Sequence, residues 1–394
     1  MTTIGIISII GLAMVAVPST IAFINMRRMH RAPRRGDAPR GDELVSCCIP
    51  ARNEEENLEA CIESLLAGDH DALEILVYDD ESTDGTSEIL ARMMAADDRI
   101  RSVETRPLPA GHNGKQHACQ RMGEAARGEW VLFTDADVRF ESGWLRRTLA
   151  VVRGREGLGL ISAFPHELTR SIGEALFVPM IHVLLLGYLP MGGMRKTLQP
   201  EASAGCGQFL FARHTAWKES GGHDAFHDSM HDGIKMPRSF RSHGWQTDLI
   251  DGTDLARCRM YRGFVESFHG FAKNGYEGLG SIWILLLITV IHLVGHLLPW
   301  VIVIYSVSTD DWLPVATPIS IAAIVMMLAS ALYGSSETPR RCAATASRCS
   351  SPSRQAPSPS PLTSSSRSSA SRPPRPARTT RRATAARASP RAPS

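Results

Sequence analysis

The segment from Trp130 to Asp137 runs an apolar strand directly into two carboxylates that are two positions apart. The strand Trp-Val-Leu-Phe is followed by Thr-Asp-Ala-Asp, so Asp135 and Asp137 lie where the strand leaves the core. Carboxylates at the end of a buried strand are costly unless a cation neutralises them. Mg²⁺ and similar hard cations bind carboxylate oxygens and share their coordination with phosphates. The pattern therefore indicates metal-assisted transfer from a phosphate-activated donor, although an isolated Asp-x-Asp pair also occurs in ordinary surface loops.

Short apolar strands alternate with helical patterns between residue 44 and about residue 262. The predicted strands are residues 44–50, 73–78, 100–103 and 130–133, and the predicted helices are residues 54–66, 86–94 and 115–126. This order predicts an α/β fold with a mostly parallel sheet and helices on both faces. Ligands of such sheets bind beyond the carboxyl ends of the strands.

Three polar, acid-bearing turns follow the predicted strands, at residues 50–55, 79–86 and 134–137. We expect the three turns to lie at the same edge of the parallel sheet. Together they support a ligand site more strongly than any one motif alone. The alternative for residues 79–86 is a turn whose Ser, Thr and Asp side chains cap the next helix. We expect Asp84 and Thr86 to serve that purpose. Asp80 directly follows its strand and is the better ligand candidate.

Three stretches contain no Asp, Glu, Lys or Arg, and each is long enough to cross a bilayer as a helix. They are residues 1–26, 278–309 and 312–336. Five arginines follow the first stretch within residues 27–35, so it resembles a signal anchor with its basic flank on the inside. We therefore predict a multi-pass protein of the cell (inner) membrane, with a basic linker at residues 27–43 and a cytoplasmic domain at residues 44–277.

The basic charge of the chain is concentrated in its last part. The net charge is +3, but residues 335–394 contain twelve Arg and a single acid, so the rest is net acidic. We therefore predict no nucleic-acid partner. Residues 337–394 consist mainly of Ser, Pro, Arg, Ala and Thr, which predicts a disordered basic tail.

The motifs I-P-A-R-N-E-E, V-Y-D-D-E-S-T-D-G-T, G-K-Q-H-A-C and F-T-D-A-D occur in that order. Together they resemble family 2 glycosyltransferases of the GT-A fold, over residues 45 to about 276. With its flanking apolar stretches, the chain is similar to the membrane-bound branch that glycosylates lipids, including carotenoid-type, hopanoid-associated and ceramide enzymes. The resemblance implies inverting transfer of one sugar from a nucleotide-diphospho-sugar to a lipid or lipid-like acceptor hydroxyl, with Mg²⁺ or Mn²⁺.

The resemblance also implies roles for individual residues. Pro50, Arg52 and Glu54 would shape the nucleotide pocket, Asp80 would accept a hydrogen bond from the base, Lys115 would approach the base or diphosphate, Asp135 would face the ribose and the metal, and Asp137 would ligate the metal. The alternative for Lys115 is an ordinary lysine at the start of a helix.

An inverting enzyme needs a general base for the acceptor hydroxyl. In the family this is an acid downstream of a Gly-Gly turn, and the best match here is Asp232, with Asp228 as the competitor. His231 stands where the family usually has another acid. Gln208, in a Gly-Cys-Gly-Gln loop, matches the acceptor side and would contact the acceptor or the donor sugar.

Arg257 and Arg259 lie where processive members of the family carry Q-R-x-R-W. They would neutralise the diphosphate leaving group, or they would face lipid headgroups. The Gln and Trp are absent, which favours transfer of a single sugar over a processive polysaccharide synthase. The apolar, proline-interrupted residues 177–191 would form either an interfacial helix or hairpin that lies on the bilayer surface, or a core helix.

Two other classes remain open at this point. A catalytically degenerate scaffold or binding protein is disfavoured by the intact Asp-x-Asp pair, although His231 argues mildly for it. A nucleotidylyltransferase is disfavoured because no Gly-rich phosphate loop precedes the first predicted helix.

Overall fold

The structure is a computed structural model that describes residues 3–34, 36–38, 41–279, 281–309 and 312–327. The predicted disordered tail, residues 337–394, lies outside the described residues, as do residues 328–336 of the third predicted membrane span.

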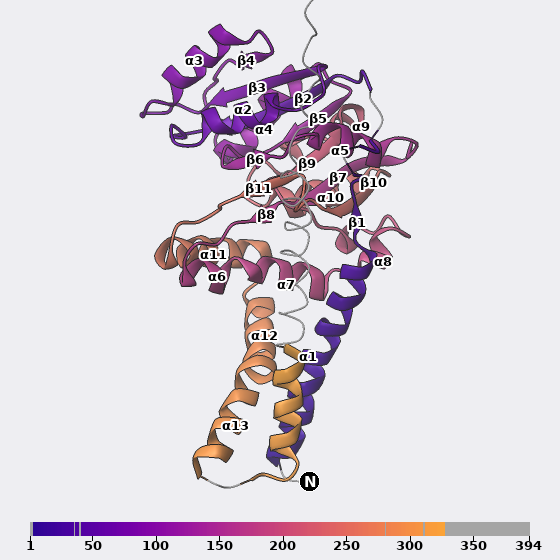
Figure 1. Cartoon of the computed structure of the whole chain (residues 1–394), viewed down its shortest axis with the longest axis vertical. Helices are drawn as coiled ribbons and strands as arrows, with labels where there is room; N and C mark the ends of the chain where they lie inside the picture. The colour runs from indigo at the N-terminus through magenta and orange to yellow at the C-terminus, as the bar shows by residue number, and fades with distance from the viewer. Residues whose placement is uncertain (1–2, 35, 39–40, 280, 310–311, 328–394) are drawn as a thin grey trace, which may run out of the picture. The chain divides into compact units, whose positions relative to one another are not determined.

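The centre of the molecule is a sheet of eight strands in the order β1-β10-β7-β9-β5-β2-β3-β4 (Figure 1). The strands are β1 (His30–Arg31), β2 (Val45–Ala51), β3 (Leu73–Asp79), β4 (Ile100–Ser102), β5 (Trp130–Phe133), β7 (Leu158–Phe164), β9 (Leu210–Arg213) and β10 (Gln246–Asp251). All neighbours pair in parallel except β9, which runs antiparallel to both β5 and β7. The prediction of a mostly parallel α/β sheet is confirmed.

A smaller sheet lies beside the first and has the order β6-β11-β8. Its strands are β6 (Val138–Phe140), β8 (His166–Glu167) and β11 (Ala256–Cys258). Because β6 begins directly after Asp137 and β8 follows β7 closely, this sheet lies against the carboxyl ends of β5 and β7. It therefore forms one side of the edge at which a ligand site is expected.

Helices cover both faces of the large sheet. They are α2 (Leu58–Leu66), α3 (Thr86–Ala96), α4 (Gly114–Ala125), α5 (Trp144–Val152), α9 (His214–Glu219) and α10 (Asp232–Ser242). In β3, Ile75 and Val77 pack into the core that includes α2, while Leu76 and Tyr78 pack into the core that includes α4. Strands buried on both faces need apolar side chains at every position, which explains their continuous apolar runs.

The predicted helix at residues 54–66 begins later, at Leu58. The reason is that the turn before it bonds to the next turn of the sheet edge. The amide of Glu54 donates to Thr86 Oγ1 at 2.8 Å, and the amide of Glu55 donates to Asp84 Oδ2 at 3.2 Å. Asp84 also accepts from the hydroxyl of Thr86. Gly85 is the N-cap residue of the next helix and has no side-chain cap bond, although Asp84 Oδ1 accepts from the amide of Thr86 at 3.1 Å. The side chains of Asp84 and Thr86 thus tie two turns together, and Thr86 does not take the expected capping role.

The segment predicted as a basic linker, residues 27–43, contributes a strand to the sheet. Helix α1 (Thr3–Arg28) is followed by β1, which pairs in parallel with β10. Next to this pair, the buried Asp248 accepts hydrogen bonds from Arg155 at 3.0 Å and Arg195 at 2.8 Å, and its Oδ2 lies 3.1 Å from Nδ1 of His30. Burial raises the pKa of Asp248, but the hydrogen bond from Arg195 and the other positive charges outweigh it and lower that pKa.

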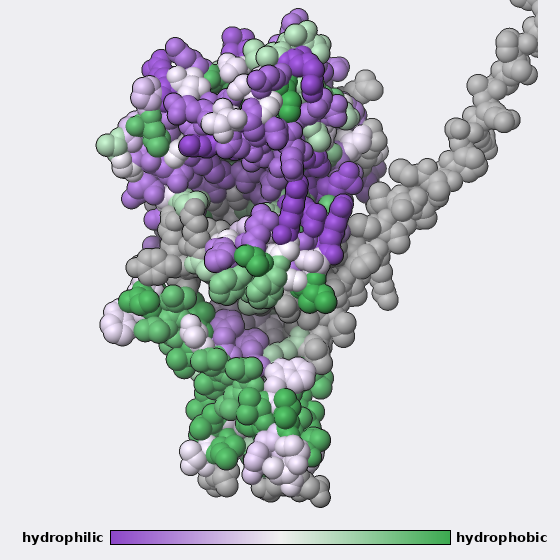
Figure 2. Space-filling view, turned by 90° about the vertical axis from the view of Figure 1, so that its left-hand side faces the viewer, coloured by the Kyte–Doolittle hydropathy of each residue, from purple (hydrophilic) through white to green (hydrophobic). Residues whose placement is uncertain are grey.

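Two helical stretches are long and apolar enough to cross a membrane, Thr3–Arg28 and Ile282–Thr309. The second consists of α12 (Ile282–His292), one π-helical turn (Leu293–Leu297) and α13 (Leu298–Thr309). A shorter apolar helix spans Ala316–Met327. Figure 2 shows the hydrophobic surface of this helical part and the hydrophilic surface over the sheets. Apolar surface of this extent is unusual on a protein surrounded by water.

Three helices lie between the sheets and the apolar helices (Figure 1). They are α6 (Ile172–Phe177), α7 (Pro179–Tyr188) and α11 (Phe264–Leu279), and the short α8 (Met191–Met194) follows α7. Asn25 of α1 donates to the carbonyls of Leu186 and Leu189 at 2.8 and 2.7 Å, which fixes α7 against α1. Residues 177–191 thus contain the end of α6, all of α7 and the start of α8, and α7 packs on the first apolar helix.

Candidate functional site

The Asp-x-Asp turn lies at the carboxyl end of β5 and is held there by backbone contacts. The amide of Thr134 donates to the carbonyl of Cys48 at 3.1 Å, and its hydroxyl donates to the carbonyl of Gln208 at 2.7 Å. These bonds place the turn between the end of β2 and the loop that contains Gln208. The two carboxylates that follow are thereby fixed at the edge where parallel strands present ligand sites.

Lys115 joins the first of these carboxylates to the candidate base. Its Nζ lies 2.6 Å from Asp135 Oδ1 and 3.1 Å from Asp232 Oδ2. Burial alone would lower the pKa of Lys115, but Asp135 and Asp232 outweigh it and raise that pKa well above its usual value. Asn113 caps the start of α4 by accepting from the amides of Lys115 and Gln116. Lys115 is therefore more than a lysine at a helix start.

Asp137 is the most crowded carboxylate of the site. Burial first, and then the charge of Asp135, raise its pKa to about 6, and its Oδ1 has no hydrogen-bond partner. A buried oxygen without a partner beside a second carboxylate fits a divalent cation. Among the described residues no group of three or more His, Cys, Asp or Glu side chains could hold a metal. The protein would thus supply Asp135 and Asp137, and donor phosphates and water would complete the coordination, as is common for Mg²⁺.

Glu167 also lies near Asp137, although it belongs to none of the sequence motifs. Burial first, and then the charge of Asp137, raise its pKa to about 8, and its Oε2 has no hydrogen-bond partner. Gln208 bonds to Glu167 and also donates to the thiol of Cys258 at 3.1 Å. A signal was present in the sequence, because Glu167 closely follows an apolar strand, as Asp137 does.

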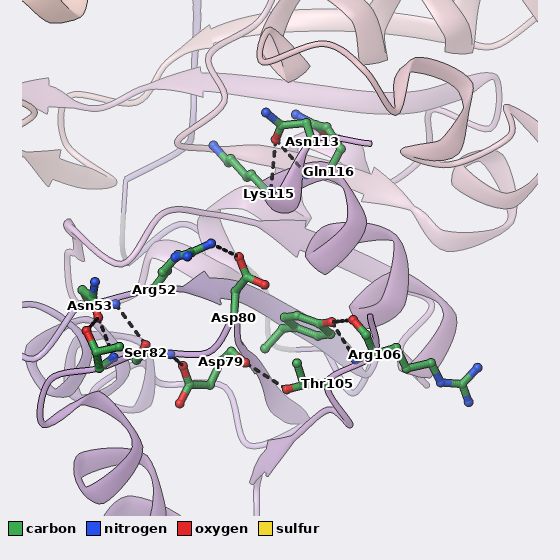
Figure 3. A network of polar contacts seen from close by, with 12 residues as sticks. Arg52, Asn53, Asp79, Asp80, Ser82, Thr105, Arg106, Asn113, Lys115 and Gln116 are labelled. Carbon is green, nitrogen blue, oxygen red and sulfur yellow. Dashed lines mark hydrogen bonds and ion pairs between the residues drawn. The ribbon is translucent and has the colours of Figure 1, made fainter. Parts of the chain in front are cut away.

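Asp80 lies beside Arg52 and the start of α4 (Figure 3). Arg52 NH1 donates to Asp80 Oδ2 at 3.1 Å. The same oxygen would lie 3.1 Å from a Cβ at position 114, so Gly114 permits this close approach. The carboxylate thus sits where the amides of a helix N-terminus favour negative charge. The predicted nucleotide-pocket residues Arg52 and Asp80 are therefore brought together.

Pro50 and Glu54 lie at the end of β2 and in the turn after it. Pro50 pairs with Tyr78 of β3, so it is part of the sheet. Burial raises the pKa of Glu54, while the hydrogen bond from Asn57 opposes that shift. The charge of Asp135 adds to the increase, which places Glu54 near the Asp-x-Asp turn.

A cavity of about 660 Å³ is lined in part by Asp79, the residue before Asp80. Ser82, Thr105 and Arg106 are among the residues that line it (Figure 3). Thr105 donates to the carbonyl of Asp79 at 2.9 Å, which fixes this wall. The residues that line the cavity do not include those predicted for the nucleotide, the metal or the acceptor.

Asp232 is the first residue of α10 and is largely buried, with 9% of its side chain exposed. Its Oδ1 accepts from the amide of Gly233 at 2.7 Å. A Cβ at position 207 would lie 2.3 Å from the same oxygen, so Gly207 is required for the loop to pass. The competitor Asp228 is exposed. Asp232 is therefore a buried residue in contact with Lys115, and it is not part of a solvated loop.

Arg257 and Arg259 form ion pairs away from these carboxylates. Arg257 lies 3.7 Å from Glu141, and Arg259 lies 2.9 Å from Glu174. The residue between them, Cys258, instead neighbours Asp137 and Gln208. Alternation along a strand explains this, because neighbouring side chains point to opposite faces. Within the described residues, the two arginines are therefore not joined to the Asp-x-Asp turn.

Comparison with known proteins finds similarity over the part of the chain that contains the Asp-x-Asp turn. Residues 46–167 match the family described as Glycosyl transferase family 2. A putative teichuronic acid biosynthesis glycosyltransferase of Bacillus subtilis is 31% identical over 112 residues, which is 28% of this chain and 43% of that protein. A 4,4'-diaponeurosporenoate glycosyltransferase of Staphylococcus haemolyticus is 24% identical over 241 residues, which is 61% of this chain and 63% of that protein. The matched parts are therefore less than two thirds of either relative.

Among solved structures, a mannosyltransferase from Pyrobaculum calidifontis, in complex with GDP-mannose and Mn²⁺, aligns with a TM-score of 0.46 and 20% identity. The alignment covers 87% of this chain and 92% of that one. The matched residues 46–167 contain β2, β3, β5 and the Asp-x-Asp turn. The similarity to glycosyltransferase family 2 is thus established over residues 46–167.

Proposed function

We propose that the protein is a membrane-bound inverting glycosyltransferase that moves one sugar from a nucleotide-diphospho-sugar to a lipid or lipid-like acceptor hydroxyl at the cytoplasmic face. The observation that carries the proposal is the bridge from Asp135 through Lys115 to Asp232. It joins the two carboxylates to which we assign cation binding and proton acceptance, in a chain whose residues 46–167 match family 2.

The residues divide the work as follows. Arg52 and Asp80, held together beside α4, would bind the nucleotide, and Asp135 and Asp137 would hold the divalent ion. When bound, such an ion neutralises charge on the diphosphate as it leaves. Asp232 would accept the proton of the acceptor hydroxyl while its oxygen forms the new bond to the sugar carbon and the bond to the diphosphate breaks.

Two observations support the membrane location. The apolar helices expose large side chains, among them Trp283 at 76% and Val307 at 73%. The similarity to a protein named 4,4'-diaponeurosporenoate glycosyltransferase agrees with a lipid-like acceptor. The departures from Q-R-x-R-W favour single transfer over a processive polysaccharide synthase.

The test uses the full chain in detergent micelles, with a panel of nucleotide sugars, Mg²⁺ or Mn²⁺ and a lipid extract. We expect metal-dependent release of a nucleoside diphosphate together with a labelled lipid product. Asp137→Asn is the matched control and should abolish both. Nucleotide binding without any release, for every donor, would overturn the proposal in favour of a degenerate binding protein.

A further inference from the structure

A second cavity lies at the inner end of helix α1, apart from the Asp-x-Asp turn. It has a volume of about 400 Å³, opens to the surface, and is lined by the last turns of α1 and by the segment from Pro190 to Thr197. Such a volume is within the range of small-molecule sites. None of the residues assigned above to the nucleotide, metal or acceptor lines it.

The lining of this cavity changes from apolar to cationic along α1. Ile21 and Ile24 belong to the apolar part of α1, while the exposed Arg28 is the last residue of α1 and the exposed Lys196 comes from the second lining segment. Neither cation forms an ion pair within the described residues. A Cβ at position 192 would lie 2.9 Å from Arg28 NH1, so Gly192 leaves room for the guanidinium over the wall.

Hydrogen bonds to the sheet domain hold the segment from Pro190 to Thr197 in place. Arg195 donates to the carbonyl of Arg28 at 2.6 Å and to Asp248 at 2.8 Å, which joins both walls to β10. Arg241 of α10 donates to the carbonyl of Thr197 at 2.6 Å and also to that of Met194. The cavity is therefore formed before any ligand binds, which reduces the entropy cost of binding.

We propose that this cavity binds the phosphate headgroup of an anionic phospholipid from the surrounding bilayer. Two unpaired cations complement a phosphate, and the isoleucines beside them complement the start of the acyl chains. A bilayer that surrounds α1 would place its headgroup layer at Arg28, where the apolar sequence ends. The proposal thus rests on the proposed membrane location.

The binding test uses the full-length protein, purified from membranes in mild detergent and mixed with dioleoyl-phosphatidylglycerol or dioleoyl-phosphatidylcholine. Native mass spectrometry counts the lipids that remain bound. We expect one phosphatidylglycerol to be retained and no comparable retention of phosphatidylcholine. Arg28→Gln combined with Lys196→Gln should weaken phosphatidylglycerol retention about 30-fold. Each basic side chain near an anionic lipid surface contributes about 1 kcal/mol of binding free energy, and about 1.4 kcal/mol corresponds to a tenfold change in affinity.

Arg27→Gln is the matched control, because Arg27 is adjacent in sequence but lies over the ring of Phe23, 4.4 Å from its centre, and does not line the cavity. It should retain the lipid within twofold, and Arg28→Lys should retain it as well. Equal losses in Arg27→Gln and the double variant would overturn the site in favour of general surface charge. Displacement of the lipid by inorganic phosphate would overturn the lipid as the ligand.

The failure of the membrane location can be distinguished from the failure of the site. If alkaline carbonate releases the wild-type protein from membranes, the membrane location is wrong and the lipid site is wrong with it. If the protein stays in membranes but the double variant keeps its phosphatidylglycerol, only the site is wrong. Thermal unfolding of the double variant, measured alongside, should match wild type and so exclude loss of the fold.

Discussion

The Nζ atom of Lys115 lies 3.1 Å from Asp232 Oδ2 while it also contacts Asp135 at 2.6 Å. One ammonium group therefore neutralises two carboxylates to which we assign different tasks, ion binding and proton acceptance. Ion binding and proton acceptance are thereby linked through a single side chain, and the linkage can be tested.

Lys115→Met should change ion binding in the absence of donor. Without the ammonium, Asp135 loses its internal counter-ion, so we expect Mn²⁺ to bind the donor-free protein more tightly, measured by electron paramagnetic resonance of free Mn²⁺. Turnover should fall about 100-fold or more, because Asp232 loses the group that positions it. Lys115→Arg keeps the charge and should leave Mn²⁺ affinity near wild type. Unchanged affinity in Lys115→Met would contradict this role.

Asp232→Asn should lower turnover by about 10²–10⁴-fold, the usual contribution of a general base. The binding of nucleotide sugar, measured by calorimetry, should remain near wild type because the amide keeps the shape of the side chain. The exposed Asp228 provides the matched control, since Asp228→Asn should turn over normally. Normal turnover in Asp232→Asn together with a large loss in Asp228→Asn would assign the base to Asp228.

The affinity for the divalent ion should depend on pH through Asp137. Its pKa is raised to about 6, so protons compete with the ion below that value. Calorimetry with Mn²⁺ should show affinity falling by up to tenfold for each pH unit below about 6 and little change above 7.

The folding stability of the ion-free protein should depend on pH in the opposite direction. A folded-state pKa above the unfolded one means that ionising Asp137 reduces stability as pH rises from about 4 to 6. Asp137→Asn should remove both dependences.

Asp248→Asn should destabilise the sheet edge. The carboxylate has no exposed surface and neutralises Arg155 and Arg195, so its removal leaves two partly exposed guanidinium groups without their counter-ion and should cost about 2 kcal/mol of unfolding free energy, less than for a fully buried pair. The lowered pKa of Asp248 means that this stabilisation is present above the unfolded pKa, near 4, and is lost as pH falls toward the folded pKa. Urea unfolding at pH 7 and at pH 4 measures both effects. The difference between variant and wild type should shrink at the lower pH.

Local pattern was sufficient to predict the first half of the sheet. Residues 130–133 form β5 as predicted, and β2 and β3 differ from the prediction by a residue or so at their ends, because their apolar runs are bounded by polar turns. The second half was not predicted in detail. Strand β9 enters antiparallel between β5 and β7, and that pairing depends on contacts distant in sequence.

The candidate site shows the same division. Asp80, Asp135 and Asp137 follow strands directly, so their positions could be inferred from the sequence. Glu167 and Cys258 reach the site only because β8 and β11 form a separate small sheet beside it. The partners of Arg257 and Arg259 could not be inferred either, since Glu141 and Glu174 lie far from them in sequence.

The pairing of β1 with β10 has a practical consequence for protein production. A shortened chain that starts at residue 44, where the family resemblance begins, would remove β1 and expose the hydrogen-bonding groups of β10. An uncovered sheet edge of this kind promotes aggregation. It would also take His30 away from Asp248. Soluble expression should therefore be attempted with chains that keep His30 and Arg31 and that replace only the apolar residues before them.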